Sequence, residues 1–112
     1  MTINHRGYEC AVTEGIDCAN IVNLRGVLGV ADADVEPILV GWVAGLHASD
    51  CVLDLRETTY IDGFGAGLIT LVSGLAAERG ITMKVIVGWG QVKRKLERLG
   101  LKAILDIDDR DP

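Results

Sequence analysis

The chain has 112 residues, of which 49% are hydrophobic and 24% are charged, and it contains only two prolines. This length and composition predict one compact domain with a buried core and exclude a disordered or collagen-like chain. Sixteen acidic and eleven basic residues give a net charge of -5, which argues against general binding to nucleic acid because the surface repels phosphates.

The N-terminal part predicts an antiparallel pair of strands. Apolar and polar residues alternate from Tyr8 to Val12, the period of a half-buried strand, and Gly15 and Asn20 then supply turn residues. Alternation resumes over Ile21–Leu28, which predicts a second strand that pairs with the first as a hairpin. The start of the chain has no apolar stretch of the kind that a secretion signal requires.

A helix and a buried strand are predicted next. Apolar residues fall at helical spacing from Asp34 onwards, which predicts a helix over 34–47 with Asp34 as its N-cap and Pro37 tolerated in its first turn. The short apolar run Cys51–Leu55 lies between helical stretches and therefore predicts a buried parallel strand.

The second half of the chain alternates helix and strand. Helices are predicted at 64–78 and 91–99, each followed by a glycine that ends it, and strands at 83–87 and 103–107. The longest uncharged run, 63–77, has fifteen residues, fewer than the roughly twenty that a membrane-spanning helix needs.

The order of these elements predicts an α/β fold, with one domain over residues 1–112 whose core spans about residues 8–107. We expect a mostly parallel sheet of about five strands, an N-terminal hairpin and three helices packed mainly on one face. Right-handed crossovers between strands that are added sequentially place every helix on the same side. The other face of the sheet is then expected to have little cover.

Patterns typical of an active site or a metal site are missing from the sequence. His5 and His47 lie in the frayed start of the chain and at the end of the first predicted helix, and no serine or cysteine has the context of an activated nucleophile. The acidic tail at 106–111 lacks the glycine turn and the distal glutamate of a calcium loop. We therefore expect no enzyme activity, no catalytic residue, no metal ion and no cofactor.

The cysteines indicate a compartment. Cys10, Cys18 and Cys51 are odd in number and form no C-x-x-C motif, so they predict neither a disulfide framework nor a zinc site. Free thiols fit a reducing environment, and we expect the chain to be cytoplasmic.

Two motifs each have two interpretations. In the glycine-rich run at 63–67, backbone N–H groups at a helix start favour a phosphate, but Asp62 places a negative charge there and no complete phosphate-binding motif is present. The alternative is that Asp62 is a helix N-cap and that the glycines allow close packing. The basic run Lys93–Arg98 either contacts an acidic partner or forms the solvated face of its helix.

Several short motifs occur in a fixed order along the chain. They are LRGVL at 24–28, VLDL at 52–55, YIDGFGAG at 60–67, VKRKL at 92–96 and GL at 100–101. Together they resemble a STAS domain, the fold of bacterial anti-sigma factor antagonists, and the resemblance runs from about Tyr8 to Ile107. Val27 and Gly29 stand where the family's strand motif, similar to L-x-G-E-L-D, has two acidic residues.

The loop before the second helix departs from the family at one important position. In the antagonists this loop resembles D-S-S-G-x-G, and its first serine accepts phosphate from a partner anti-sigma factor that is also a kinase. Asp62 and Gly65 fall on the family's Asp and Gly, whereas Gly63 replaces the phosphoacceptor serine and Phe64 the serine after it. The resemblance therefore implies a switch that has lost its hydroxyl groups.

The resemblance implies a non-enzymatic regulatory binding module. Its expected partner is a protein, an anti-sigma factor with a histidine-kinase-like ATPase fold, and it is not phosphorylated at the usual position. The alternative is a STAS subunit that supports the ATPase of a lipid-transport ABC system. A neighbouring sigma-factor gene would favour the first function, and neighbouring transporter genes the second. Direct nucleic-acid binding and membrane insertion are not expected.

The partner-binding residues are expected to be Asp62, Gly63, Phe64, Gly65 and Trp89. Turns at the carboxyl ends of parallel strands lie at one edge of the sheet, so Phe64 and Trp89 are predicted to be near neighbours. Glycines on both sides of each ring leave it uncovered, which predicts an aromatic docking patch. The alternative is that one or both rings close the end of the core.

Self-association of the chain is also expected. Its mean hydropathy of +0.31 is high for a small acidic protein, and Ile69 and Ala76 are predicted to lie beside the inward face of the second long helix. Exposed apolar surface favours a partner, so we predict a homodimer.

Overall fold

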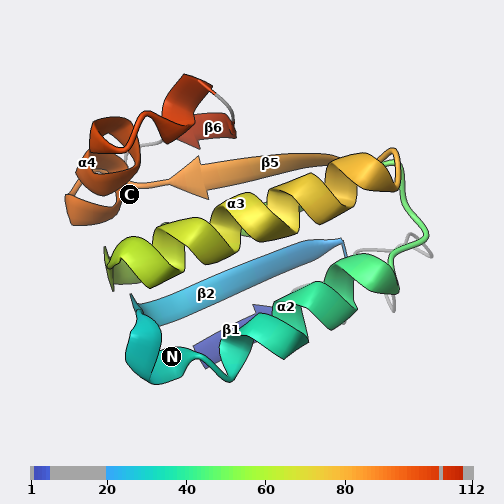
Figure 1. The fold of residues 1–112 in the computed structure, drawn as a ribbon, viewed down its shortest axis with the longest axis horizontal. Coiled ribbons are helices and arrows are strands. Elements are labelled where there is room, and N and C mark those ends of the chain that lie inside the picture. Colours follow the sequence, from blue (N-terminus) through green and yellow to red (C-terminus); the bar gives the residue numbers. More distant parts are fainter. Residues whose placement is uncertain (1, 6–19, 104, 110–112) are drawn as a thin grey trace.

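A mixed sheet organises the computed structural model of the chain, which describes residues 2–5, 20–103 and 105–109 (Figure 1). Within these residues, six strands follow the order β1-β2-β3-β5-β6, and β4 also pairs with β2. The strands are β1 (Thr2–His5), β2 (Ile21–Leu28), β3 (Asp50–Asp54), β4 (Thr58–Ile61), β5 (Thr82–Val87) and β6 (Asp106–Asp109). Only β1 is antiparallel to its neighbour, so the predicted α/β class with a mostly parallel sheet is confirmed.

Helices connect the parallel strands. They are α2 (Val35–Ala44), α3 (Gly63–Glu78) and α4 (Gln91–Arg98), with short 3-10 turns η1 (Val30–Asp32) and η2 (Leu101–Ala103). Figure 1 shows α2 and α3 side by side in front of the sheet, as expected for right-handed crossovers between strands added in one direction. The three predicted helices are confirmed.

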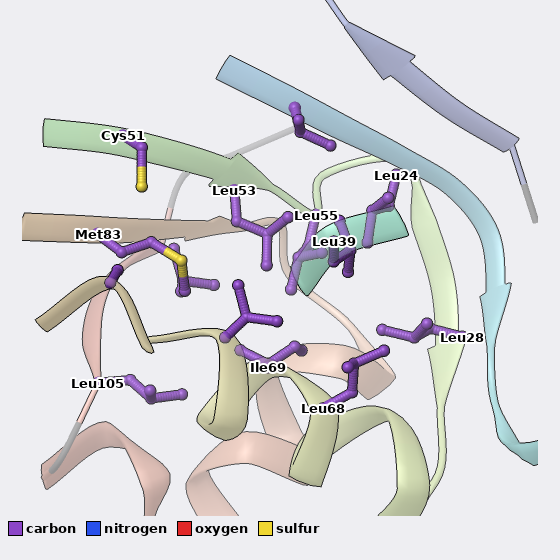
Figure 2. Packing of buried hydrophobic residues seen from close by; sticks show 14 of the residues in the cluster. Leu24, Leu28, Leu39, Cys51, Leu53, Leu55, Leu68, Ile69, Met83 and Leu105 are labelled. Carbon is purple, nitrogen blue, oxygen red and sulfur yellow. The ribbon is translucent and has the colours of Figure 1, made fainter. Parts of the chain in front are cut away.

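The core lies between the sheet and this helix layer. In Figure 2, Leu24 and Leu28 of β2 and Leu53 of β3 point toward the helices, where Leu68 and Ile69 of α3 meet them. Fully burying one such side chain contributes about 1.5–3 kcal/mol. Helix α4 adds Val92 and Leu96 to the same cluster. The turns that lead from β4 to α3 and from β5 to α4 are therefore attached to a packed core.

Strands β3 and β4 run along β2 as two halves of one interrupted strand. β3 pairs with the first part of β2, from Ile21↔Val52 to Asn23↔Asp54, and β4 pairs with the last part through Leu28↔Ile61. The register shifts between Gly26 and Val27, and Gly26 has a φ of 104°, a conformation that favours glycine. The interruption separates the end of β4 from β5.

Several element boundaries differ from the predictions. The antiparallel partner of β2 is Thr2–His5, so His5 lies in a strand and not in a frayed start, while the predicted strand at 8–12 lies outside the described residues. Helix α2 ends at Gly45, whose N–H bonds back to the carbonyl of Gly41, and so stops before the expected residue 47. The last strand begins at Asp106 because residues 101–103 form η2. β4 was not predicted at all.

The face of the sheet away from α2 and α3 is covered at its centre. Asn23 lies between core residues of β2, and Asp54, the last residue of β3, lies between the core residues Leu53 and Leu55, so alternation turns both side chains to the other face. Both are 1% exposed, and the Asn23 side-chain amide donates to the Asp54 carbonyl at 3.4 Å. The expectation of little cover is wrong at this point.

The outer surface of the helix layer also differs from expectation. Ile69 and Ala76 are fully buried, so they cannot form the predicted self-association surface. The exposed large apolar side chains of this layer are Ile38 of α2 and Leu71 of α3. Self-association stays a prediction, without its original residues. In the described part of the chain, no helix is long and apolar enough to span a bilayer.

Candidate functional site

The turn between β4 and α3 is organised by one carboxylate. Asp62 is the N-cap of α3, and its Oδ1 accepts a hydrogen bond from the Gly65 N–H at 2.9 Å. Its Oδ2 accepts from the Val30 N–H at 3.0 Å and so joins the start of η1 to the same turn. These bonds, from Gly65 first and then Val30, lower the pKa of Asp62 because they stabilise the charged form. The N-cap interpretation of Asp62 is confirmed.

The glycines around Asp62 differ in how much space surrounds them. A Cβ on Gly65 would lie 2.3 Å from the Leu28 carbonyl oxygen, so this position accepts only glycine. A Cβ on Gly29 would lie 3.0 Å from the Asp62 carboxylate. Gly63 and Gly67 have open space where a Cβ would stand. Close packing therefore explains Gly65 but neither Gly63 nor Gly67.

No hydroxyl group stands at the two serine positions of the resembled loop, because they hold Gly63 and Phe64. The nearest threonine hydroxyl groups in the sequence belong to β4. Thr58 is buried and donates to the Leu24 carbonyl at 2.8 Å, and Thr59 donates to the Gly26 carbonyl at 3.2 Å. Both hydroxyls therefore serve the pairing of β4 with β2.

The turn between β5 and α4 is built differently. Gly90 is the N-cap of α4, has a φ of 149° and makes no side-chain cap hydrogen bond. Trp89 before it is 65% exposed, and the Lys93 ammonium lies 5.8 Å from the centroid of its ring, within cation–π range. Phe64, in contrast, is half-buried and packs against the core. Trp89 is thus exposed, as the predicted aromatic patch requires, whereas Phe64 is partly exposed and partly packed on the core, and docking on these two rings stays a prediction.

Gln91 joins the two turns. Its side-chain oxygen accepts from the Ile61 N–H and its side-chain NH2 donates to the Ile61 carbonyl, both at 2.9 Å. The amide thus takes the place of a neighbouring strand on the edge of β4 that β5 leaves unpaired. Sequence reasoning did not identify Gln91, because its role depends on β4, which was not predicted. This pair of bonds brings the two turns together, while the predicted proximity of Phe64 to Trp89 stays a prediction.

A cleft of about 230 Å³ opens where β4 and β5 separate. Its lining consists of Arg56, Thr58, Thr59, Gly88, Trp89, Gly90, Gln91 and Val92. Arg56 is held by Asp54, with Nε at 3.0 Å from Oδ1 and Nη2 at 2.8 Å from Oδ2. The hydrogen bond and then the charge of Asp54 raise the pKa of Arg56. The cleft thus has the guanidinium of an Arg56–Asp54 ion pair on one wall and the exposed indole of Trp89 on another.

Groups with catalytic or metal-binding chemistry do not gather in the described residues. No cluster of three or more His, Cys, Asp or Glu side chains there is placed to hold a metal ion. Cys51 is a buried free thiol, and burial, followed by the charge of Asp50, raises its pKa to about 11. Because it stays protonated at neutral pH, it is a poor nucleophile.

Three comparisons place this geometry among known proteins. The model of the STAS domain family matches residues 9–110. A comparison with curated protein sequences finds no match. Among solved structures, the fold is similar to the crystal structure of a Thermotoga maritima protein assigned as an anti-sigma factor antagonist. That match has a TM-score of 0.69 and 19% sequence identity, and it covers 81% of this chain and 80% of the other.

Proposed function

The chain belongs to the STAS domain family, and on this premise we propose that it is a non-enzymatic regulatory binding module. Its proposed partner is an anti-sigma factor with a histidine-kinase-like ATPase fold, which it binds in the cytoplasm. The proposed contact residues are those of the two joined turns, Asp62, Gly63, Gly65 and Trp89, with Phe64 supporting the surface from the core.

One observation supports the further proposal that phosphorylation does not control this binding. Gly63 is exposed and has open space for a Cβ, so a serine would fit there without moving any neighbour. The position is therefore sterically suited to a phosphoacceptor but holds a residue that has no acceptor oxygen. The hydroxyls of Thr58 and Thr59 are poor substitutes because both are bonded to backbone carbonyls.

The test is phosphorylation by an extract of the source cells supplied with ATP, followed by phosphopeptide mass spectrometry. The unmodified chain is expected to gain no phosphate between Thr58 and Gly67. Gly63→Ser is expected to gain it at residue 63. Gly67→Ser is the matched control, because it adds the same hydroxyl to another exposed and open position of the same helix.

Two results would contradict the proposal. Stoichiometric phosphate on any residue from 58 to 67 of the unmodified chain would show that the switch is retained. Affinity capture from the same extract tests the partner: recovery of a transporter ATPase in place of an anti-sigma factor would favour the alternative function as a subunit of a lipid-transport ABC system.

A further inference from the structure

Charge is strongly segregated along this chain. Residues 89–102 hold five of the eleven basic residues and one of the sixteen acidic ones, a net charge of +4. The rest of the chain therefore has a net charge of -9, which sums with this segment to the total of -5. An acidic ligand is thus attracted to one segment and repelled by the remainder.

The basic segment includes α4, whose first residues line the cleft. We use the name α4 surface for Trp89, Arg94, Lys95 and Arg98. Arg94 and Arg98 are exposed and lie one helical turn apart on α4, opposite the buried Val92 and Leu96. Within the part of the chain that the structure describes, Arg94, Lys95 and Arg98 have no acidic partner within 4.0 Å.

We propose that the α4 surface binds an acidic segment of the protein partner, with carboxylates on Arg94 and Arg98 and an apolar contact on the Trp89 ring. The inference rests on the proposed binding function and adds the chemistry of the partner. Exposed tryptophan and arginine are the residue types that most often dominate the energy of protein interfaces. Arg56 on the cleft wall is already paired with Asp54, so the attraction for carboxylates comes from Arg94, Lys95 and Arg98.

A protein segment fits this surface better than nucleic acid or a membrane does. The exposed arginines span a single helical turn, and a polyanion or a bilayer would extend beyond them onto the rest of the chain, whose net charge is -9. A short acidic peptide can contact this one helical turn of α4 without approaching the acidic rest of the chain. The cleft, at about 230 Å³, accommodates one or two side chains.

Fluorescence of Trp89 measures the interaction directly. Trp42→Phe removes the other tryptophan of the chain and keeps an aromatic ring in α2. The probe is a blocked peptide of ten glutamates, titrated at low salt into this background. The expected result is a saturable change in Trp89 emission that weakens as NaCl is raised. Arg94→Gln with Arg98→Gln should raise the Kd about fivefold, the effect of losing two exposed ion pairs.

The control removes the same two charges elsewhere. Arg25→Gln with Lys84→Gln lies on β2 and β5, outside the α4 surface, and should leave the Kd within about twofold. No saturable response, equal loss in both double variants, or tighter binding of a ten-nucleotide single-stranded DNA or of phosphatidylglycerol vesicles would overturn the inference. Each of these results leaves the phosphorylation test at Gly63 unaffected, so the two failures are distinguishable.

Discussion

The two turns that follow β4 and β5 have the same place in the fold and opposite constructions. In the first, Asp62 caps α3, ties in η1 through Val30 and lies against a glycine that admits no side chain. In the second, Gly90 gives α4 no side-chain cap, and Trp89 extends into solvent beside an open cleft. One turn uses its polar groups internally, while the other presents an aromatic ring and a basic helix.

This difference suggests that the first turn serves the packing of the fold and the second serves binding. The first turn has kept the carboxylate and the tight packing that shape the start of α3, and it has no hydroxyl at position 63 or 64. The second turn has the exposed side chains from which binding energy is usually drawn. Gln91 connects them, since its amide bonds the start of α4 to the last residue of β4.

The largest expected effect on stability comes from adding a side chain to the tightly packed first turn. Gly65→Ala should destabilise the chain by about 3 kcal/mol, because its Cβ would lie 2.3 Å from the Leu28 carbonyl oxygen and backbone would have to move. Gly63→Ala is the matched control at an open position of the same helix start, and it should change stability by at most about 0.5 kcal/mol. Urea unfolding gives both values. Equal effects would show that the first turn is not tightly packed.

The next largest effect is the difference in stability cost between truncating Phe64 and truncating Trp89. Phe64→Ala should cost about 2 kcal/mol, less than a fully buried phenylalanine, because Phe64 is partly buried against the core. Trp89→Ala should cost less than about 0.5 kcal/mol, since its ring is 65% exposed. The measurement is the free energy of unfolding, with partner capture from the source extract beside it. Loss of capture without loss of stability is expected for Trp89→Ala alone.

Local patterns predicted much of this molecule. Alternation predicted β2, glycine ends predicted where α3 and α4 stop, and the charge and position of Asp62 predicted its cap. These features depend on residues close together in sequence, whose preferences survive in the folded chain. For the same reason, the STAS resemblance followed from the order of short motifs.

Features that depend on distant contacts could not be predicted. β4 has four residues and exists through its pairing with the end of β2, where the register shifts at Gly26. Phe64 lies in the first turn of α3 and is partly buried, whereas Trp89 precedes α4 and is exposed, although glycines flank both in the sequence. A side-chain amide such as Gln91 can replace a strand only where a strand edge has been left open.

The link between the turns can itself be broken. Gln91→Ala should leave the Ile61 N–H and carbonyl without their partner and cost about 1.5 kcal/mol. Gln91→Glu keeps an acceptor for the N–H and loses the donor to the carbonyl, so its effect should lie between those of the wild type and the alanine variant. Urea unfolding gives both costs, and hydrogen exchange of the Ile61 amide should speed up most in Gln91→Ala. Unchanged exchange would show that this pair of bonds does not protect β4.

The smallest effect at neutral pH concerns the charge of the Asp62 cap, and this effect is lost in acid. The hydrogen bonds from Gly65 and Val30 lower the pKa of Asp62 below its ordinary 3.8, so the folded chain favours the carboxylate. The resulting stability is fully present above about pH 4 and is lost as the pH falls through the lowered pKa. Asp62→Asn keeps a capping oxygen and removes this titration, so its urea midpoint should fall less steeply with acid than that of the wild type.

The control for the loss of charge is Asp34→Asn, at the start of α2. It removes the same charge from an N-cap whose side chain makes no cap hydrogen bond, so at neutral pH it should lower stability less than Asp62→Asn does. A carboxyl carbon resonance of Asp62 that titrates at or above pH 3.8 would contradict the role of these two bonds in holding the charge.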